Sequence, residues 1–425
     1  MSALSLTRRA ALAGLGVTVD LLAGHAFSDS EPELARRKLV MVVCRGGLDG
    51  LSLSPPVGDP NYAGLRGSIA IGPPGAPGGA LRLDETFGLH PALPGIHALA
   101  LKGEARIAPA VATPDRERSH FEAQDVLESG AGKVYATSSG WLNRALAAMK
   151  PAGGVRAISV GPTSPLILRG KIEVASWSPG GMAQRDQRLP GILQDLYAHD
   201  PLLGPALAEG LATEAMAKTA LAEGAAIEPA APAPNSMRTP GPGPDRPAPG
   251  QSQGLSQARR IGADLAGFMV QPAGFQVVAI SLDNFDTHAN QGGAQGQLAT
   301  RLSYVDAFID GLRAGLGPAW RDTAVVLATE FGRTASINGT NGTDHGTAST
   351  ALILGGAIRR GGVIGDWPTL ARNRLFENRD VYPTLDMRGL FKGVLRDHLG
   401  IDRAALDRAV FPDSASVTPV GGLIA

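Results

Sequence analysis

Short apolar runs alternate with amphipathic stretches along most of the chain. Apolar runs closed by glycine or polar residues predict strands at 38–44, 105–111, 155–160, 166–168, 275–282, 323–328 and 351–354. Apolar positions at helical spacing predict helices at 91–101, 119–129, 141–149, 189–225, 255–268, 296–316 and 384–399. Because strands alternate with helices, we expect an α/β fold with a mixed, mostly parallel sheet and helices on both faces.

One stretch, residues 228–253, interrupts this pattern. It is rich in Pro, Gly and Ala and has too few apolar side chains to pack a core, so it predicts a disordered surface insertion. Residues 55–90 are also rich in Gly and Pro and predict long loops. Candidate functional residues lie on both sides of the insertion, so we expect one α/β domain over 38–412 rather than two domains.

The N-terminus carries Arg8-Arg9 before a mildly apolar stretch, a pattern typical of a twin-arginine export signal. We expect residues 1–30 to be this signal, which predicts the export machinery as a partner and a periplasmic or secreted location. The alternative is a frayed basic N-terminus. The apolar stretch is too short and too polar to span a bilayer, and we expect no transmembrane span elsewhere in the chain.

Charge and cysteine content exclude several functions. Lys plus Arg and Asp plus Glu both number 39, which gives no electrostatic reason to bind nucleic acid or an anionic membrane. The single cysteine, Cys44, cannot form an internal disulfide. It ends the apolar run 38–44, so we expect a buried strand thiol rather than a nucleophile.

Acidic residues and histidines follow the predicted strands. Asp286 and His288 come after 275–282, Glu330 comes after 323–328, and Asp344-His345 lie in the Gly-rich loop before 351–354. The carboxyl ends of parallel strands meet in one crevice, so these groups can share a divalent metal. The alternatives are a loop histidine bonded to a nearby aspartate, a salt bridge between Glu330 and Arg333, and a polar turn at 344–345.

Other candidates lie near the ends of 38–44 and 105–111. Asp49 is either a metal ligand or the start of an Asx-turn. Ser119 and His120 are candidate catalytic residues. Ser119 opens a predicted helix, where free N–H groups favour phosphate, and a plain N-cap is the alternative. Arg45 and Arg333 are candidates to bind a substrate anion.

Several of these segments together resemble a bacterial exported family catalogued as domain of unknown function 1501. They are Arg45-Gly-Gly-Leu-Asp-Gly, Ser119-His-Phe, Phe285-Asp-Thr-His, Thr329-Glu-Phe-Gly-Arg-Thr and Gly342-Thr-Asp-His-Gly. That family is similar to a remote branch of the alkaline phosphatase and sulfatase superfamily. The resemblance implies an alkaline-phosphatase-like sheet with, in active members, two metal ions.

The resemblance also implies roles for single residues. Asp49, Asp286, His288 and His345 are similar to metal ligands of the superfamily, and Ser119 stands where its nucleophile would open a helix. Glu330 stands where an Asp-His pair usually follows a strand, with Phe331 in place of the histidine. This departure favours a single ion, or a harder metal such as Mn, Ca or Mg, over a standard two-zinc site.

We therefore expect an exported metal-dependent hydrolase of phosphate- or sulfate-type esters, acting on a small-molecule or polymer substrate. One or two divalent ions (Zn, Mn, Ca or Mg) would polarise the ester, with Ser119 or a metal-bound water as nucleophile. The predicted ligands are Asp49, Asp286, His288, Glu330, Asp344 and His345. The alternative is a non-catalytic exported protein that keeps the metal on the same scaffold for a binding or structural role.

Overall fold

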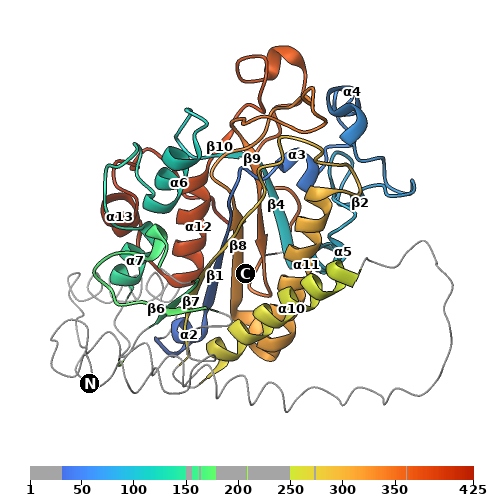
Figure 1. Cartoon of the computed structure of the whole chain (residues 1–425). Coiled ribbons are helices and arrows are strands. Elements are labelled where there is room, and N and C mark those ends of the chain that lie inside the picture. Colours follow the sequence, from blue (N-terminus) through green and yellow to red (C-terminus); the bar gives the residue numbers. More distant parts are fainter. Residues whose placement is uncertain are drawn as a thin grey trace, which may run out of the picture. The chain divides into compact units, whose positions relative to one another are not determined.

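An eight-stranded sheet forms the centre of the computed structural model, which describes residues 31–149, 156–161, 164–178, 208, 249–271, 274–359 and 361–425 (Figure 1). Within these residues the strand order is β10-β4-β9-β8-β1-β7-β5-β6. The strands are β1 (Lys38–Cys44), β4 (Ala105–Ala112), β5 (Ala157–Val160), β6 (Ala175–Trp177), β7 (Val277–Leu282), β8 (Thr323–Ala328), β9 (Ser349–Leu354) and β10 (Leu385–Asp386). A separate antiparallel pair joins β2 (Leu81–Arg82) and β3 (Gly88–Leu89).

Strand β9 runs against its neighbours β4 and β8, while the pairs of β1 with β7 and β8, of β5 with β6 and β7, and of β4 with β10 are parallel. The predicted mixed, mostly parallel sheet is confirmed. The reversal of β9 has a consequence for the loops. The carboxyl ends of β1, β4, β7 and β8 and the amino end of β9 lie at the same edge of the sheet.

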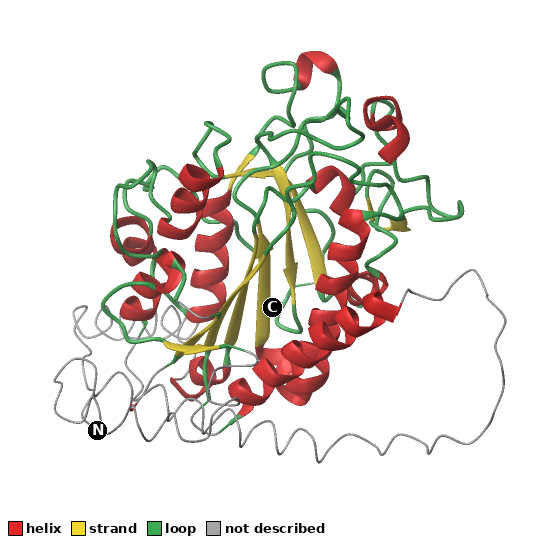
Figure 2. Cartoon of the chain, in the orientation of Figure 1, coloured by secondary structure: helices red, strands yellow, loops and turns green. Residues whose placement is uncertain are grey.

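Helices cover both faces of the sheet, as predicted (Figure 2). Val40 and Val42 of β1 pack with apolar side chains of α5 (Pro94–Leu101), α10 (Pro249–Val270) and α11 (Gln297–Leu316). Leu39 and Met41 pack with those of α6 (His120–Ser129), α7 (Trp141–Ala148) and α12 (Met387–Leu399). Alternate residues of a strand point to opposite faces, so one apolar run contributes to both cores.

Shorter helices lie in the connections. They are α3 (Gly50–Leu53), α4 (Tyr62–Arg66) and α13 (Arg403–Ala405), the single 3-10 turns η1 (Gly67–Ile69), η2 (Leu166–Leu168), η4 (Gly317–Asp322) and η5 (Arg372–Arg374), and the π-helical turn η6 (Leu406–Val410). Residues Arg37–Ala425 form one compact unit, whereas α2 (Glu31–Arg36) belongs to a short N-terminal unit of its own. No helix in the described ranges is long and apolar enough to cross a membrane.

Most element predictions agree with the structure, and the strands at 38–44 and 323–328 agree at both ends. The strand predicted at 166–168 is wrong. Those residues form a 3-10 turn in which the Leu168 amide donates to the Pro165 carbonyl (3.0 Å). The predicted loops at 55–90 also contain short helices and the β2–β3 pair. Residues 1–30, almost all of the helix predicted at 189–225 and most of 228–253 lie outside the described residues; α10 begins at Pro249, inside the predicted insertion.

Candidate metal centre

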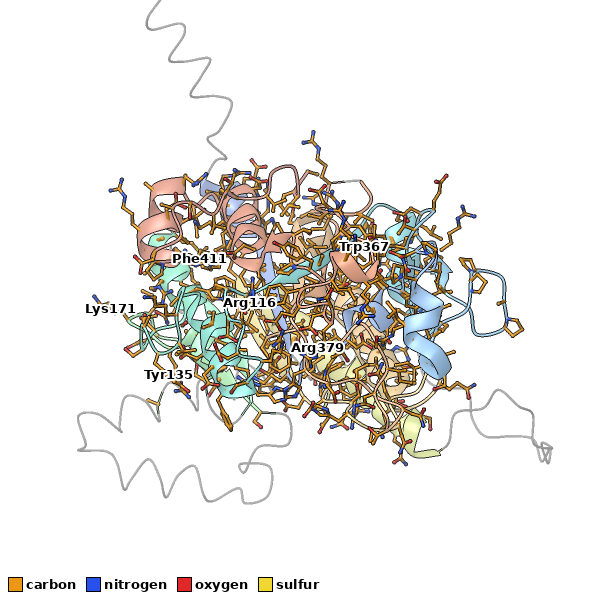
Figure 3. All side chains as sticks on the ribbon, turned by 90° about the horizontal axis from the view of Figure 1, so that it is seen from above. Arg116, Tyr135, Lys171, Trp367, Arg379 and Phe411 are labelled. Atoms are coloured by element: carbon orange, nitrogen blue, oxygen red, sulfur yellow. The ribbon has the colours of Figure 1, made fainter. Side chains whose placement is uncertain are left out.

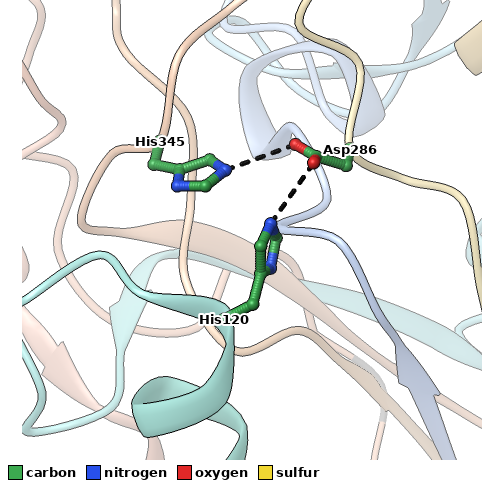
Figure 4. Close-up of side chains that lie close together, drawn as sticks. All are labelled: His120, Asp286 and His345. Carbon is green, nitrogen blue, oxygen red and sulfur yellow. Dashed lines mark hydrogen bonds and ion pairs between the residues drawn. The ribbon is translucent and has the colours of Figure 1, made fainter.

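Side chains from three separate loops meet at the carboxyl edge of the sheet. His120 opens α6, Asp286 follows β7, and His345 precedes β9. Each offers one ligand atom, and these atoms lie within 4.8 Å of one another. Figure 4 shows both imidazole rings pointing toward the Asp286 carboxylate, at 3.4 Å from His120 Nε2 to Oδ2 and 3.3 Å from His345 Nε2 to Oδ1.

His288 joins this group from the same loop as Asp286. Its Nε2 lies 3.0 Å from Asp286 Oδ1 and 3.0 Å from His345 Nε2. Three imidazole nitrogens and one carboxylate therefore gather in one place. We call His120, Asp286, His288 and His345 the metal cluster, because imidazole and carboxylate groups are the usual protein ligands of divalent transition metals.

Each of the three rings is held through its other nitrogen by an oxygen acceptor. The Nδ1 contacts are His120 with Glu330 Oε1 (2.9 Å), His345 with the Arg118 carbonyl (2.8 Å) and His288 with Asp344 Oδ1 (3.4 Å). A carbonyl or an ionised carboxylate can only accept, so a neutral ring in such a contact carries its hydrogen on Nδ1 and presents a lone pair at Nε2. Outer contacts of this kind accompany histidine ligands in metal proteins.

Two rings of the cluster have pKa values shifted in opposite directions. Burial, with the nearby positive charges of Arg333 and His120, lowers the pKa of His345, which favours the neutral ring, whose Nε2 lies 3.0 Å from His288 Nε2. The hydrogen bond that His120 donates to Glu330 raises the pKa of His120, which favours a positive charge at that ring. His120 Nε2 is buried and has no hydrogen-bond partner. A cation among these nitrogens would satisfy the lone pairs.

Asp286 remains ionised in this setting. Burial alone would raise its pKa, but the hydrogen bond and charge of Arg333, together with His288 and His120, hold the pKa below its ordinary value. The same residue is about two-fifths exposed, at 41% of its side chain. An ionised carboxylate reachable from solvent is available to a cation or a substrate.

Phe331 packs against two of the imidazole rings. Its ring centroid lies 4.9 Å from that of His120 and 4.8 Å from that of His345. A Cβ at Gly47, whose φ is +63°, would lie 2.4 Å from the Phe331 ring, so only glycine fits there. Phe331 does not stand in a ligand position of the cluster; it packs beneath the ligands.

Glu330 and Asp344, both predicted as ligands, lie behind the cluster. The buried Glu330 accepts hydrogen bonds from the Gly46 amide (2.8 Å), from Gln124 Nε2 (3.3 Å) and from Thr329 Oγ1 (2.9 Å), besides His120. Burial would raise its pKa, but the hydrogen bond from His120 and the backbone amides lower it. Asp344 contacts His288 and Asn338. The structure thus corrects their placement: each orients a histidine.

Arg333 is also corrected. Its guanidinium is buried and donates to the carbonyls of Gly47 (2.7 Å), Thr343 (3.0 Å), Phe285 (3.3 Å) and Gly46, and to the Asp286 carboxylate. These contacts link three loops. They also use the guanidinium N–H groups that would otherwise bind a substrate anion. The salt bridge to Glu330 considered from the sequence is not formed either, because Arg333 pairs with Asp286.

Asp49 is not part of the metal cluster. Its buried carboxylate pairs with Arg66 and accepts from the Leu51 amide (3.2 Å), Ser52 Oγ (2.8 Å) and Gln291 Nε2 (2.6 Å). It caps α3, as the Asx-turn alternative suggested. The prediction that Asp49 is a metal ligand is therefore not supported by its position.

Ser119 occupies the N-cap position of α6, yet its side chain makes no cap hydrogen bond, unlike Asp49. Ser119 directly precedes His120 in the chain. Arg45 contacts Glu128 and lines a cleft next to the cluster, while its Nε has no partner within the described part of the chain.

Sequence reasoning placed His120 among catalytic residues rather than ligands, and it missed the Arg118 carbonyl entirely. Arg118 adopts a positive φ of 59°, which turns its carbonyl toward His345. Figure 3 looks onto this edge of the sheet, with Arg379 near the middle of the view. Its guanidinium donates to the His345 carbonyl at 2.7 Å. No local sequence signal marks such backbone contacts.

Comparison with known proteins now places the chain. Residues 36–410 match the family model described as protein of unknown function (DUF1501). The chain belongs to the DUF1501 family. This confirms the family expected from the sequence motifs. Among curated proteins, none matches this DUF1501 member.

Solved structures resemble this DUF1501 chain at low identity. Ps i-CgsB in complex with k-i-k-neocarrahexaose is 11% identical with a TM-score of 0.39, covering 89% of this chain and 76% of that one. The Zn complex of the C-terminal periplasmic domain of EcEptC from Escherichia coli is 11% identical with a TM-score of 0.36, covering 90% and 86%. The lipoteichoic acid synthase LtaP from Listeria monocytogenes is 8% identical with a TM-score of 0.39, covering 92% and 80%. The fold class follows from the sheet topology itself.

Proposed function

We propose that this DUF1501 protein binds a divalent transition-metal ion in the metal cluster and hydrolyses phosphate- or sulfate-type esters. One observation carries the proposal. Three imidazole Nε2 atoms gather around the Asp286 carboxylate, and each ring faces an oxygen acceptor through its Nδ1. The Nε2 atoms of His288 and His345 lie 3.0 Å apart, and the buried His120 Nε2 has no hydrogen-bond partner, so a cation would complete the group.

The donor set favours nitrogen-binding metals. Three imidazoles and one carboxylate suit Zn better than Mn, Ca or Mg, which prefer oxygen ligands. The harder ions expected from the sequence rested on Glu330, Asp344 and Asp49 as direct ligands, and these three carboxylates lie elsewhere. Zn is therefore the first ion to test.

The chain's own residues suggest how an ester would react. A bound ion would act as a Lewis acid on the ester oxygens and stabilise developing charge. Ser119 is the proposed nucleophile, because its side chain makes no cap hydrogen bond and the residue directly precedes His120 at the start of α6. Glu330 holds the His120 ring in one orientation, and Arg45 is the remaining candidate to contact the substrate anion.

Export forms part of the proposal. The Arg8-Arg9 motif supports a twin-arginine signal and a periplasmic or secreted location. The twin-arginine machinery carries folded proteins, so the metal would be inserted before export.

The test combines metal analysis with turnover. Purified protein is expected to contain about one equivalent of metal and to hydrolyse at least one member of a panel of phosphate and sulfate esters. The variant carrying both Asp286→Ala and His288→Ala should lose the metal and lower turnover by about 10² to 10³-fold. His97→Ala is the matched control, because His97 contacts the Arg82 carbonyl outside the cluster. Full metal content and turnover in the double variant would refute the proposal.

A non-catalytic metal protein on the same scaffold is the second candidate. Four protein ligands close a tetrahedral zinc site, which is the arrangement of structural rather than catalytic zinc. Tightly bound metal without turnover on any ester of the panel would favour this candidate.

A further inference from the structure

A cleft runs along α6, and Arg45 is the one residue of its lining that has a role in the proposed chemistry. It is lined by residues of α6, by the end of β1 and by the loops after β5 and β7. Gln124 lines it and donates to Glu330, the carboxylate that holds His120. Phe121, also in the lining, is the residue after His120. Phe121 and Gln124 therefore connect the lining of the cleft to His120 and to its partner Glu330.

Phe121 is unusual because it is a large apolar side chain left in solvent. It is 81% exposed, although the first turn of α6 lies next to the candidate site. Exposing an aromatic ring forgoes the free energy of burial, and a ring at the rim of a polar cleft offers a flat apolar face to a ligand.

The polar lining mixes hydrogen-bond donors with acceptors. Asp125 and Asp283 supply carboxylate oxygens, while Arg45 and Arg169 supply guanidinium N–H groups. The Arg45 Nε is buried without a partner, so at least one donor is uncommitted. A phosphate group can only accept and an ammonium group can only donate, whereas a hydroxyl does both. A polyhydroxyl ligand fits this mixture best.

We propose that the cleft binds a sugar unit and that the substrate is a phosphorylated or sulfated carbohydrate. A sugar ring carries hydroxyl groups at its edge for the mixed lining and an apolar C–H face for Phe121. The proposal rests on the proposed ester hydrolysis, and it adds the class of alcohol to which the acid is attached.

The test uses the metal-loaded full chain and esters that share one acid. The 6-phosphates and 6-sulfates of glucose, galactose and N-acetylglucosamine are compared with ethyl phosphate and ethyl sulfate. At least one sugar ester should be preferred over the ethyl ester in kcat/KM. In Phe121→Ala the ratio of the two kcat/KM values should fall by about tenfold, mainly through the KM for the sugar ester.

The exposed position of Phe121 means that this substitution should leave folding intact. Leu101→Ala is the matched control, because Leu101 is 72% exposed but lies at the end of α5, outside the cleft. It should leave the ratio unchanged. Equal kcat/KM values for sugar and ethyl esters, or an unchanged ratio in Phe121→Ala, would overturn the proposal.

A binding arm separates this inference from the proposed function. Neutral trisaccharides of the same three sugars are titrated into the metal-loaded protein by calorimetry, with Phe121→Ala in parallel. Binding that weakens about tenfold in the variant supports the sugar subsite. If no ester is hydrolysed as well, that result contradicts only the proposed hydrolysis and not the subsite. Absence of binding by any of the trisaccharides would overturn the subsite itself.

Discussion

Two aspartates, each in a loop that follows a strand of the sheet, have opposite surroundings. Asp49 follows β1 and is buried among four donor groups, from Arg66, Leu51, Ser52 and Gln291. Asp286 follows β7, remains partly exposed, and faces three imidazole nitrogens. From the sequence the two residues looked equivalent, because each stands near the carboxyl end of a parallel strand.

The difference lies in which hydrogen bonds the protein completes by itself. The Asp49 network pairs an acceptor with donors, so it needs no ligand. In the Asp286 group the Nε2 atoms of His288 and His345 lie 3.0 Å apart, and the buried His120 Nε2 has no hydrogen-bond partner beside its ion-pair contact with Asp286. Converging acidic and imidazole groups are therefore expected to hold a metal only where imidazole nitrogens lack hydrogen-bond donors.

Asp49→Ala is expected to have the largest effect and tests whether Asp49 differs from Asp286 in role. Removing this carboxylate leaves the buried Arg66 charge unpaired, so the free energy of unfolding should fall by about 3–5 kcal/mol while the folded protein keeps its metal. Urea denaturation and metal analysis measure the two effects. Asp402→Ala removes an exposed N-cap bond to Ala405 and should cost only about 1 kcal/mol. Loss of metal at unchanged stability in Asp49→Ala would make Asp49 a ligand and end the distinction.

A smaller effect is expected from Glu330→Gln. The amide keeps the shape of the side chain but removes the charge that stabilises the Nδ1–H of His120. Metal affinity should fall about 10 to 100-fold, or about 1.4–2.7 kcal/mol, without loss of the site. Competition with a chelator measures this. Glu128→Gln, a buried carboxylate paired with Arg45, should leave metal affinity unchanged. Complete loss of metal binding in Glu330→Gln would instead place Glu330 among the ligands.

His398 is a buried histidine outside the metal cluster and tests the same comparison. It also has a buried unpartnered nitrogen, Nδ1, but it donates through Nε2 to the Lys38 carbonyl (2.8 Å) and lies outside the metal cluster. Burial lowers its pKa from 6.5 to about 4. The unfolded chain therefore takes up the proton first as the pH falls.

The stabilising contribution of neutral His398 is fully present above pH 6.5 and is lost between pH 6.5 and about 4, by about 1.4 kcal/mol per pH unit at most. His398→Gln should flatten this part of the stability curve in urea denaturation at pH 7, 6 and 5. His97→Gln, outside this contact, should not. An unchanged slope in His398→Gln would assign the acid sensitivity to other groups.

Much of the fold could be predicted because apolar runs such as 38–44 and 323–328 are buried on both faces of the sheet and contain little else. Short secondary-structure elements could not be predicted in this way. Residues 166–168 are apolar like a strand, but their geometry depends on Pro165 and on Glu128, whose carboxylate accepts from the Ile167 amide (3.1 Å). A run of three residues is too short for its hydrophobic periodicity to distinguish a strand from a 3-10 turn.

The location of the candidate site could be predicted from the sequence, but not which of its residues are ligands and which support them. Strand ends identify Asp286, His288 and His345 as neighbours, since the sheet topology brings those loops together. The separation of ligands from supporting groups depends on distant partners, such as Arg66 for Asp49 and the Gly46 and Gly47 carbonyls for Arg333. Residues between 14 and 287 positions apart make these contacts, and no local pattern encodes them.

The contact between Arg333 and Asp286 also sets the charge balance of the cluster. Asp286, Glu330 and Asp344 bring three negative charges, and the buried guanidinium cancels one. Two negative charges remain, which a divalent ion would neutralise. A trivalent ion would leave a net positive charge in a partly buried place. The arginine that links the loops therefore also reduces the negative charge that a bound cation would meet.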